Sequence, residues 1–272
     1  MKSFRIFIIA SLIAVLGISG LTAQSAGASS LKGMSLNGAT GLYSIPTGRI
    51  GWEQTSNFGL DFGYHTIIDG DKATHLPKLA MSLFKWVEFS AAFDIQPDGH
   101  FSEKDGSDFI TGIKIQFPLK KTALALGGNF QLLNMSNSDI SYKAGQIYLA
   151  VTYAGNFFDW PSETTVVLGK TFIDDNKNSN IDFGMGFDLM FLPQQLDGLV
   201  HWILDFSNFS YSVEAFGADS WSRGVLNTGL RIDMSRISPF NKFKFVIDIL
   251  VTDAFDTNRA FSAGVVFGVP IL

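Results

Sequence analysis

Charged side chains recur at alternate positions in segments that are otherwise apolar. In residues 181–191, IDFGMGFDLMF, Asp182 and Asp188 fall on one parity and the large apolar residues on the other. Successive side chains of a strand point to opposite faces, so one face is charged or small and the other aromatic. Across the chain, the residues expected on the charged face of the strands are Asp61, Glu88, Asp94, Lys114, Asp182, Asp188, Asp205, Glu214, Arg231, Asp233, Lys244 and Asp248, with His65 and His201. This acidic excess predicts a face that attracts cations and repels anions.

The elements that carry these charges are strands. About thirteen alternating segments lie between residues 58 and 267. Together they predict an all-β fold, a transmembrane antiparallel up-and-down β-barrel over residues 56–272, with lipid outside and a polar lumen inside. An even strand number is expected, and a bulge at the register shift between Phe206 and Tyr211 gives about twelve strands, with a range of 10–14. A soluble β-sandwich would also alternate, but it would not normally need 26 Phe residues.

The connections between these segments differ in length. Long polar connections are predicted at 66–76, 96–108, 133–144 and 173–180, and shorter ones near Lys85, at Lys120-Lys121 and at Pro193–Gly198. Short periplasmic turns and longer outer loops are typical of membrane barrels, so the first strand is expected to run outward.

The charged face has two interpretations in such a barrel. Its carboxylates could line an open, cation-favouring channel, or they could pair with Lys114, Arg231 and Lys244 across strands and hold a closed interior. Barrels of about eight strands are filled by side chains and those of about sixteen leave a channel, so twelve does not decide between the two. An N-terminal segment lying inside the barrel could decide it.

The N-terminus has the pattern of an export signal. Lys2 and Arg5 precede an apolar run, and Ala26-Gly27-Ala28 offers a small-x-small cleavage site. We therefore expect residues 1–28 to be a cleaved signal peptide, residues 29–55 to form a periplasmic segment or a lumen plug, and the protein to reside in the outer membrane of a diderm bacterium. The chain has no cysteine, which excludes a lipid-modified N-terminus, disulfides and thiolate chemistry. Its formal charge of −5 argues against nucleic acid as a partner.

No motif for catalysis or metal binding is convincing. The sequence has no GxSxG, no HExxH and no phosphate-binding loop. The loop DDNKNSNID from Asp174 to Asp182 places oxygen ligands at alternate positions, but Ser179 stands where a calcium loop has Gly and Met185 where it has a bidentate Glu. We therefore predict no catalytic residue, no metal, no cofactor and no enzymatic activity.

Residues 33–52, GMSLNGATGLYSIPTGRIGW, are too rich in Gly to form a regular strand. Within them, Gly41-Leu42-Tyr43-Ser44-Ile45-Pro46-Thr47-Gly48-Arg49 resembles the Gly-Leu-x-x-x-Pro-Thr-x-Arg entry segment of YjbH-type outer-membrane barrels, carried by Gly41, Pro46, Thr47 and Arg49. The stretch from Asp253 to Arg259 resembles the C-terminal end of the same family, and the chain is similar in size to small spirochaete outer-membrane proteins that have been compared with the OmpW type. The resemblance implies an outer-membrane barrel with a role in polysaccharide export or small-molecule passage, and no catalytic residues.

The expected function is that of a porin or channel for small polar or cationic solutes. Two alternatives remain open: a structural or adhesive barrel that acts through its surface loops, and an accessory barrel for exopolysaccharide export. The expected partners are outer-membrane lipid, the barrel-insertion machinery, small polar solutes and host or envelope surface molecules, but no nucleic acid.

Overall fold

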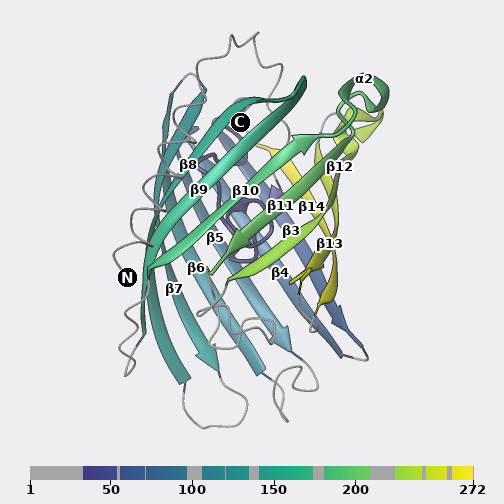
Figure 1. Cartoon of the computed structure of the whole chain (residues 1–272). Coiled ribbons are helices and arrows are strands. Elements are labelled where there is room, and N and C mark those ends of the chain that lie inside the picture. Colours follow the sequence, from purple (N-terminus) through teal and green to yellow (C-terminus); the bar gives the residue numbers. More distant parts are fainter. Residues whose placement is uncertain are drawn as a thin grey trace, which may run out of the picture.

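The fold is a closed barrel of twelve antiparallel strands, which confirms the predicted fold class and strand number (Figure 1). The computed structural model describes residues 33–53, 56–70, 72–96, 106–119, 121–134, 141–173, 181–208, 224–240, 243–255 and 259–271. Each strand pairs with its neighbours in the chain, and β14 pairs with β3 to close the wall. The strands are β3 (Phe58–Asp69), β4 (Lys72–Leu83), β5 (Val87–Gln96), β6 (Gly106–Pro118), β7 (Thr122–Asn134), β8 (Ser141–Phe157), β9 (Trp160–Ile173), β10 (Asp182–Met190), β11 (Val200–Ser207), β12 (Val225–Asp233), β13 (Lys244–Thr252) and β14 (Ala260–Pro270).

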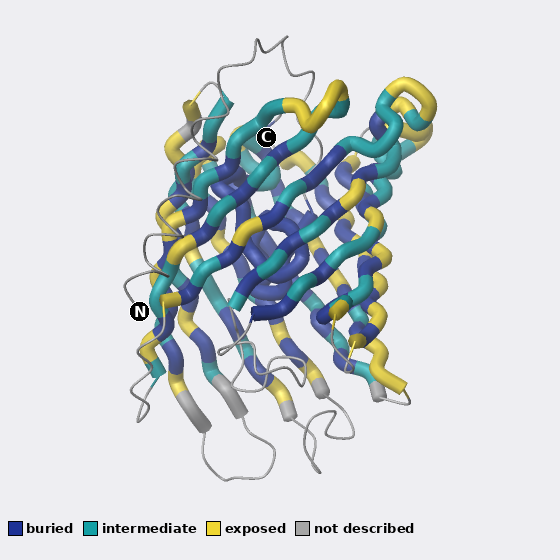
Figure 2. The backbone as a smooth tube through the Cα atoms, in the orientation of Figure 1, coloured by how far each residue is buried: buried dark blue, intermediate teal, exposed yellow. Residues whose placement is uncertain are grey.

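Side chains alternate between the two faces of the wall along each strand. In β3, Phe62 and Tyr64 point outward and are 50% and 41% exposed, whereas Asp61 and His65 point inward and are fully buried. Figure 2 shows this alternation as bands of buried and exposed residues along the strands. The period of two in the sequence therefore separates an apolar, aromatic outer face from a small and polar inner face.

The predicted long connection at 66–76 is wrong. Strands β3 and β4 stay paired as far as Asp69 and Lys72, so the turn between them is a tight hairpin in which Gly70 has a positive φ of 61°. The polar residues of this stretch lie in strands because an inner face admits polar side chains. The middle parts of the other three long connections, residues 211–215 and the predicted signal peptide lie outside the described residues.

The other rim of the barrel carries the predicted short connections. Phe84 and Lys85 turn the chain in the left-handed region between β4 and β5, and α2 (Pro193–Leu196) stands between β10 and β11. The start of β3 and the end of β14 lie at this same rim, where Gly59 pairs with Pro270. Among the described residues, no helix is long and apolar enough to cross a membrane.

Residues 33–52 lie inside the barrel, and we call them the plug. Strand β1 (Gly33–Met34) pairs with β2 (Thr40–Gly41), and a bridge joins Gly41 to Pro46. All residues from 33 to 50 are buried, and the plug is visible as a dark coil in the centre of the barrel (Figure 2). The barrel wall therefore surrounds a compact segment that precedes it in the chain.

Candidate functional site

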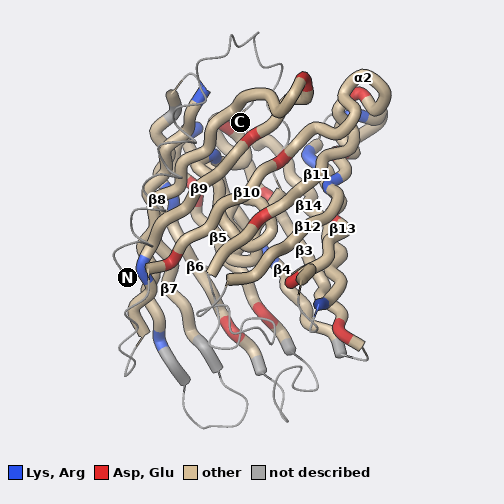
Figure 3. Tube along the Cα trace, viewed as in Figure 1, with Lys and Arg blue, Asp and Glu red and all other residues tan. Residues whose placement is uncertain are grey.

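The inner face of the wall, where it contacts the plug, is the most highly charged region of the described protein. Of the twelve charged residues that the sequence assigned to this face, eleven are buried on it: Asp61, Glu88, Asp94, Lys114, Asp182, Asp188, Asp205, Arg231, Asp233, Lys244 and Asp248. Within the described strands, ten buried carboxylates stand against four buried Lys or Arg side chains. Figure 3 shows that Lys, Arg, Asp and Glu positions, buried and exposed together, occur over the whole height of the barrel. Glu214, also expected there, lies outside the described residues.

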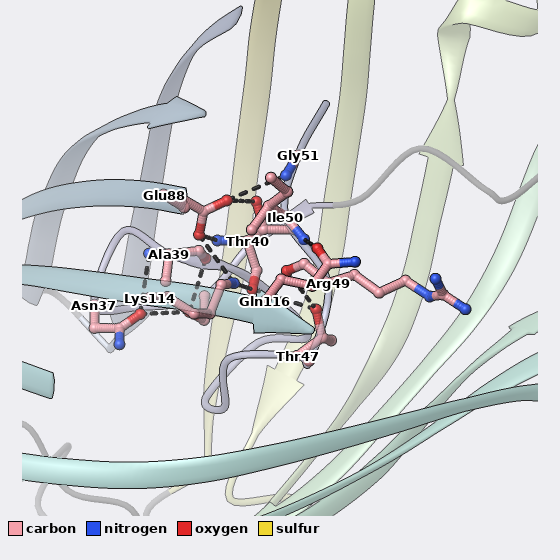
Figure 4. Close-up of polar contacts among 12 residues, drawn as sticks. Asn37, Ala39, Thr40, Thr47, Arg49, Ile50, Gly51, Glu88, Lys114 and Gln116 are labelled. Atoms are coloured by element: carbon pink, nitrogen blue, oxygen red, sulfur yellow. Dashed lines mark hydrogen bonds and ion pairs between the residues drawn. The ribbon is translucent and has the colours of Figure 1, made fainter. Parts of the chain in front are cut away.

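An ion pair on β5 and β6 holds the middle of the plug (Figure 4). Glu88 and Lys114 are cross-strand neighbours, and Lys114 Nζ lies 2.9 Å from Glu88 Oε1. The Thr40 N–H donates to Glu88 at 2.8 Å, and Lys114 donates to the Thr40 carbonyl at 2.9 Å. Glu88 also accepts a bond from the Gly51 N–H at 3.1 Å. The wall therefore satisfies both backbone groups of one plug residue with opposite charges.

A single carboxylate on β11 holds the turn of the plug. The N–H groups of Tyr43 and Ser44 both donate to Asp205 Oδ2 at 2.8 Å. The other oxygen of Asp205 accepts bonds from the Ser44 hydroxyl and from the Asn227 amide, each at 2.8 Å. These four hydrogen bonds allow the carboxylate to be buried, although it has no cationic partner among them.

Two further basic side chains bind plug carbonyls. Arg231 makes a bidentate ion pair with Asp248, with Nε···Oδ1 at 2.8 Å and Nη2···Oδ2 at 3.0 Å, and its Nη1 donates to the Gly41 carbonyl at 3.2 Å. Lys78 Nζ donates to the carbonyls of Met34 and Ser35 at 3.2 and 3.1 Å. Lys78 alternates with the apolar residues Leu79 and Met81, so the sequence pattern could have placed it on the inner face. The sequence prediction nevertheless omitted it.

The end of the plug meets the wall at two further ion pairs. Lys244 Nζ lies 2.8 Å from Asp61 Oδ2, and the indole N–H of Trp52 donates to Asp61 at 2.9 Å. Arg49 contacts Glu163 on β9 at 2.9 Å and Glu53, four residues along the chain, at the same distance. Glu163 is a second wall residue that the sequence prediction missed.

The remaining residues named from the sequence have other surroundings. Asp182 accepts bonds from wall residues Thr171 and Gln146, and Asp188 lies 2.5 Å from His201. The motif residues Gly41, Pro46, Thr47 and Arg49 are all buried within the plug. Thus the structure brings Asp61 together with Lys244, Glu88 with Lys114, and Asp248 with Arg231, which is the cross-strand pairing of the second interpretation. No group of His, Asp or Glu side chains in the described part of the chain could hold a metal ion.

Glycines of the wall make room for the apolar side chains of the plug. A Cβ added to Gly184 would lie 2.5 Å from Ile45 Cγ2, one at Gly186 would lie 2.6 Å from Leu42 Cδ1, and one at Gly63 would lie 2.8 Å from Met34 Sδ. At Gly59 an added Cβ would meet the Trp52 ring at 2.4 Å. The small inward residues of β10 therefore have a specific role, because each accommodates a plug side chain. We call the four glycines, Gly59, Gly63, Gly184 and Gly186, the sockets.

Part of the lumen is apolar. One buried cluster joins inward-facing wall residues to four residues of the plug, Leu36, Leu42, Tyr43 and Ile45. Those wall residues are Ile67, Leu76, Ile110, Tyr148, Ala150, Val167, Ile203, Leu250 and Ala260. Several of them lie toward the ends of β3, β4, β6, β13 and β14 at the rim opposite the one that carries α2. The plug is therefore held by a hydrophobic cluster as well as by hydrogen bonds.

No family model and no curated protein matches the sequence. Among solved structures, the chain is similar to "KdgM porin" at a TM-score of 0.47 and 8% identity, over 78% of this chain and 99% of that one. It is also similar to the outer membrane protein Omp33 of Acinetobacter baumannii, at 0.42 and 10% identity over 79% and 98% of the two chains. A third similar structure is the translocator domain of the autotransporter NalP from Neisseria meningitidis, at 0.40 and 8% identity over 80% and 90%. At these identities the likeness concerns the barrel fold alone and assigns no function.

Proposed function

We propose that this protein is an outer-membrane channel for small polar or cationic solutes that its own plug holds closed. The observation that carries the proposal is the set of sockets. At Gly59, Gly63, Gly184 and Gly186 the wall has no side chain of its own to fill the lumen, and plug side chains occupy that space. A twelve-stranded barrel built for rigidity alone could fill its interior with wall side chains. Displacement of the plug would therefore leave a passage.

The charge of the wall supports a preference for cations. Its ten buried carboxylates exceed its four basic side chains, and withdrawal of the plug also removes Arg49 from Glu163. Carboxylates that then face water raise the local concentration of cations and repel anions. Solutes of this kind, small, polar and neutral or cationic, are the proposed cargo.

The outer face supports a place in a membrane. Large apolar side chains such as Phe62, Phe130 and Ile249 are about half exposed on the strands, which is the pattern of a wall in contact with lipid. The export signal expected from the sequence directs the proposal to the outer membrane of a diderm bacterium. The proposal includes the resemblance to YjbH-type barrels. The test below distinguishes the channel from the adhesive and export alternatives.

The test uses a disulfide that fastens the plug to the wall. An ideal Cβ at Gly184 lies 3.6 Å from the Cβ of Ile45, within the roughly 3.5–4.5 Å range of disulfides, and the chain has no cysteine of its own. We would refold the full chain with Ile45→Cys and Gly184→Cys, insert it in planar bilayers under a KCl gradient, and record the current before and after reduction.

The oxidised protein should be silent, and reduction in the same membrane should produce stepwise currents with a cation-selective reversal potential. The single variant Ile45→Cys controls for the effect of the reductant. A protein that is folded, as judged by heat-modifiable migration in gels, but equally silent in both states would overturn the gated channel. A polysaccharide phenotype or surface binding that persists in the oxidised state would then favour the export or adhesive alternative.

A further inference from the structure

The wall recognises the plug mainly through its backbone. Six plug N–H groups, those of Thr40, Tyr43, Ser44, Gly48, Ile50 and Gly51, donate to wall side chains. Four plug carbonyls, those of Met34, Ser35, Thr40 and Gly41, accept bonds from wall side chains. The wall partners are Lys78, Glu88, Lys114, Gln116, Thr152, Asp205 and Arg231. Because every peptide carries these backbone groups, the arrangement suits a polypeptide rather than an ion or a sugar.

The charges are arranged to match a peptide backbone. Carboxylates accept from N–H groups, and ammonium or guanidinium groups donate to carbonyls, so each charge meets the end of a peptide dipole that it stabilises. Glu88 and Lys114 contact the two sides of Thr40 in this way (Figure 4). Arg231 remains paired with Asp248 while it binds the Gly41 carbonyl. The site thus recognises a peptide while most of its own charges remain paired.

The sockets add sequence selectivity to this backbone recognition. They accommodate large apolar side chains at the plug positions of Met34, Leu42, Ile45 and Trp52. Two plug glycines approach the wall closely: a Cβ at Gly38 would lie 2.4 Å from the Ala91 carbonyl oxygen, and one at Gly48 would lie 2.3 Å from that of Ala123. Gly38 also has a positive φ of 84°. Both positions therefore require glycine, since the clash is with backbone atoms that cannot move aside.

We infer that the lumen wall is a sequence-selective peptide-binding site, which binds a peptide of the plug's sequence when another molecule supplies it. The inference rests on the proposed function, because a peptide can enter only when the resident plug leaves. The ligand class is a glycine-containing peptide of about the plug's length, with apolar residues spaced to reach the four sockets. Such a peptide would close the channel in place of the resident plug.

The experiment uses the full chain with Gly38→Val and Gly48→Val, so that the resident plug no longer fits an unchanged wall. Conductance is recorded in planar bilayers, and a synthetic peptide of residues 33–52 is then added. This peptide should block the current to saturation. A peptide with the same two valines should block at least about tenfold more weakly, the equivalent of 1.4 kcal/mol in binding free energy. Equal block by both peptides, or by neither, would overturn the inference.

The two failures can be told apart. If the folded valine variant is silent before any peptide is added, the proposed channel function fails. If it conducts and the two peptides act alike, the channel function stands and only the peptide site fails. Should the variant not fold, a full chain with the single change Gly184→Cys is incubated with a plug peptide that carries Ile45→Cys, and the disulfide is measured by mass. Cross-linking of this peptide above the level of its two-valine counterpart supports the site, and equal cross-linking refutes it.

Discussion

Replacement of Asp205 by Asn should weaken the hold of the wall on the plug. The carboxylate accepts three hydrogen bonds from the plug, two from the N–H groups of Tyr43 and Ser44 and one from the Ser44 hydroxyl. Asn has one acceptor oxygen, and its NH₂ group would then face N–H donors or lose the Asn227 amide as a partner. The variant therefore keeps the size of the side chain, but even where its amide oxygen replaces Oδ2 and keeps both plug N–H groups, it accepts them as a neutral and not as a charged group.

The magnitude follows from the kind of bond that is lost. A hydrogen bond to a charged group contributes about 1.5–3 kcal/mol net and a neutral one about 0.5–1.5 kcal/mol, so the loss of the charge on two bonds weakens the docking of the plug by roughly 2 kcal/mol. That energy corresponds to a shift of roughly 30-fold in the equilibrium between docked and released plug. The larger population of released plug should appear in planar bilayers as a higher fraction of time in the conducting state, with the single-channel current nearly unchanged.

Asp182→Asn is the matched control. Asp182 is also buried on the inner face, on the strand next to that of Asp205, and the bonds that it accepts come from wall residues Thr171 and Gln146. Its substitution should therefore affect the wall but leave the open fraction close to that of the wild type. Equal open fractions in the two variants would refute the argument that the Asp205 carboxylate holds the plug.

Three further predictions follow from the same structure. Gly184→Ala should release the plug, because its Cβ would lie 2.5 Å from Ile45 Cγ2, whereas Gly145→Ala, with nothing within 4 Å, should not; limited proteolysis of the plug compares the two. Lys78→Met should leave two plug carbonyls without their donor and speed amide hydrogen exchange at the start of the plug, and unchanged exchange rates would contradict that role. Phe62→Arg, near the middle of β3 on the outer face, should lower stability in lipid by about 2–4 kcal/mol, measured by urea titration in vesicles, and a change below about 1 kcal/mol would argue against lipid contact at that position.

The wall was predictable from the sequence because its rule is local. Alternate residues face opposite sides of a strand, so Phe62 and Asp61 can be assigned to different faces without knowledge of any partner strand. The same rule explains the error at residues 66–76. Polar inward residues such as Thr74 were taken as loop residues, although a polar inner face allows a strand to continue through them.

The partners within the site could not be predicted in this way. Asp61 and Lys244 are 183 residues apart, and they meet because both flank Gly268 of β14, which has no side chain between them. That contact depends on the register of three strands around the closing seam. The position of the plug was also left open between periplasm and lumen, since a stretch rich in Gly has no periodicity from which to infer a face.

The placement of Trp52 links the plug to the order in which the barrel can assemble. Its ring packs against Gly59 of β3 and Gly268 of β14, the first and last strands of the wall, which pair only when the barrel closes. The plug precedes both strands in the chain, so it is already present when β14 arrives. The pairing of β14 with β3 therefore completes the binding site of Trp52. This last long-range pairing of the wall is stabilised by the plug, which is not part of the wall.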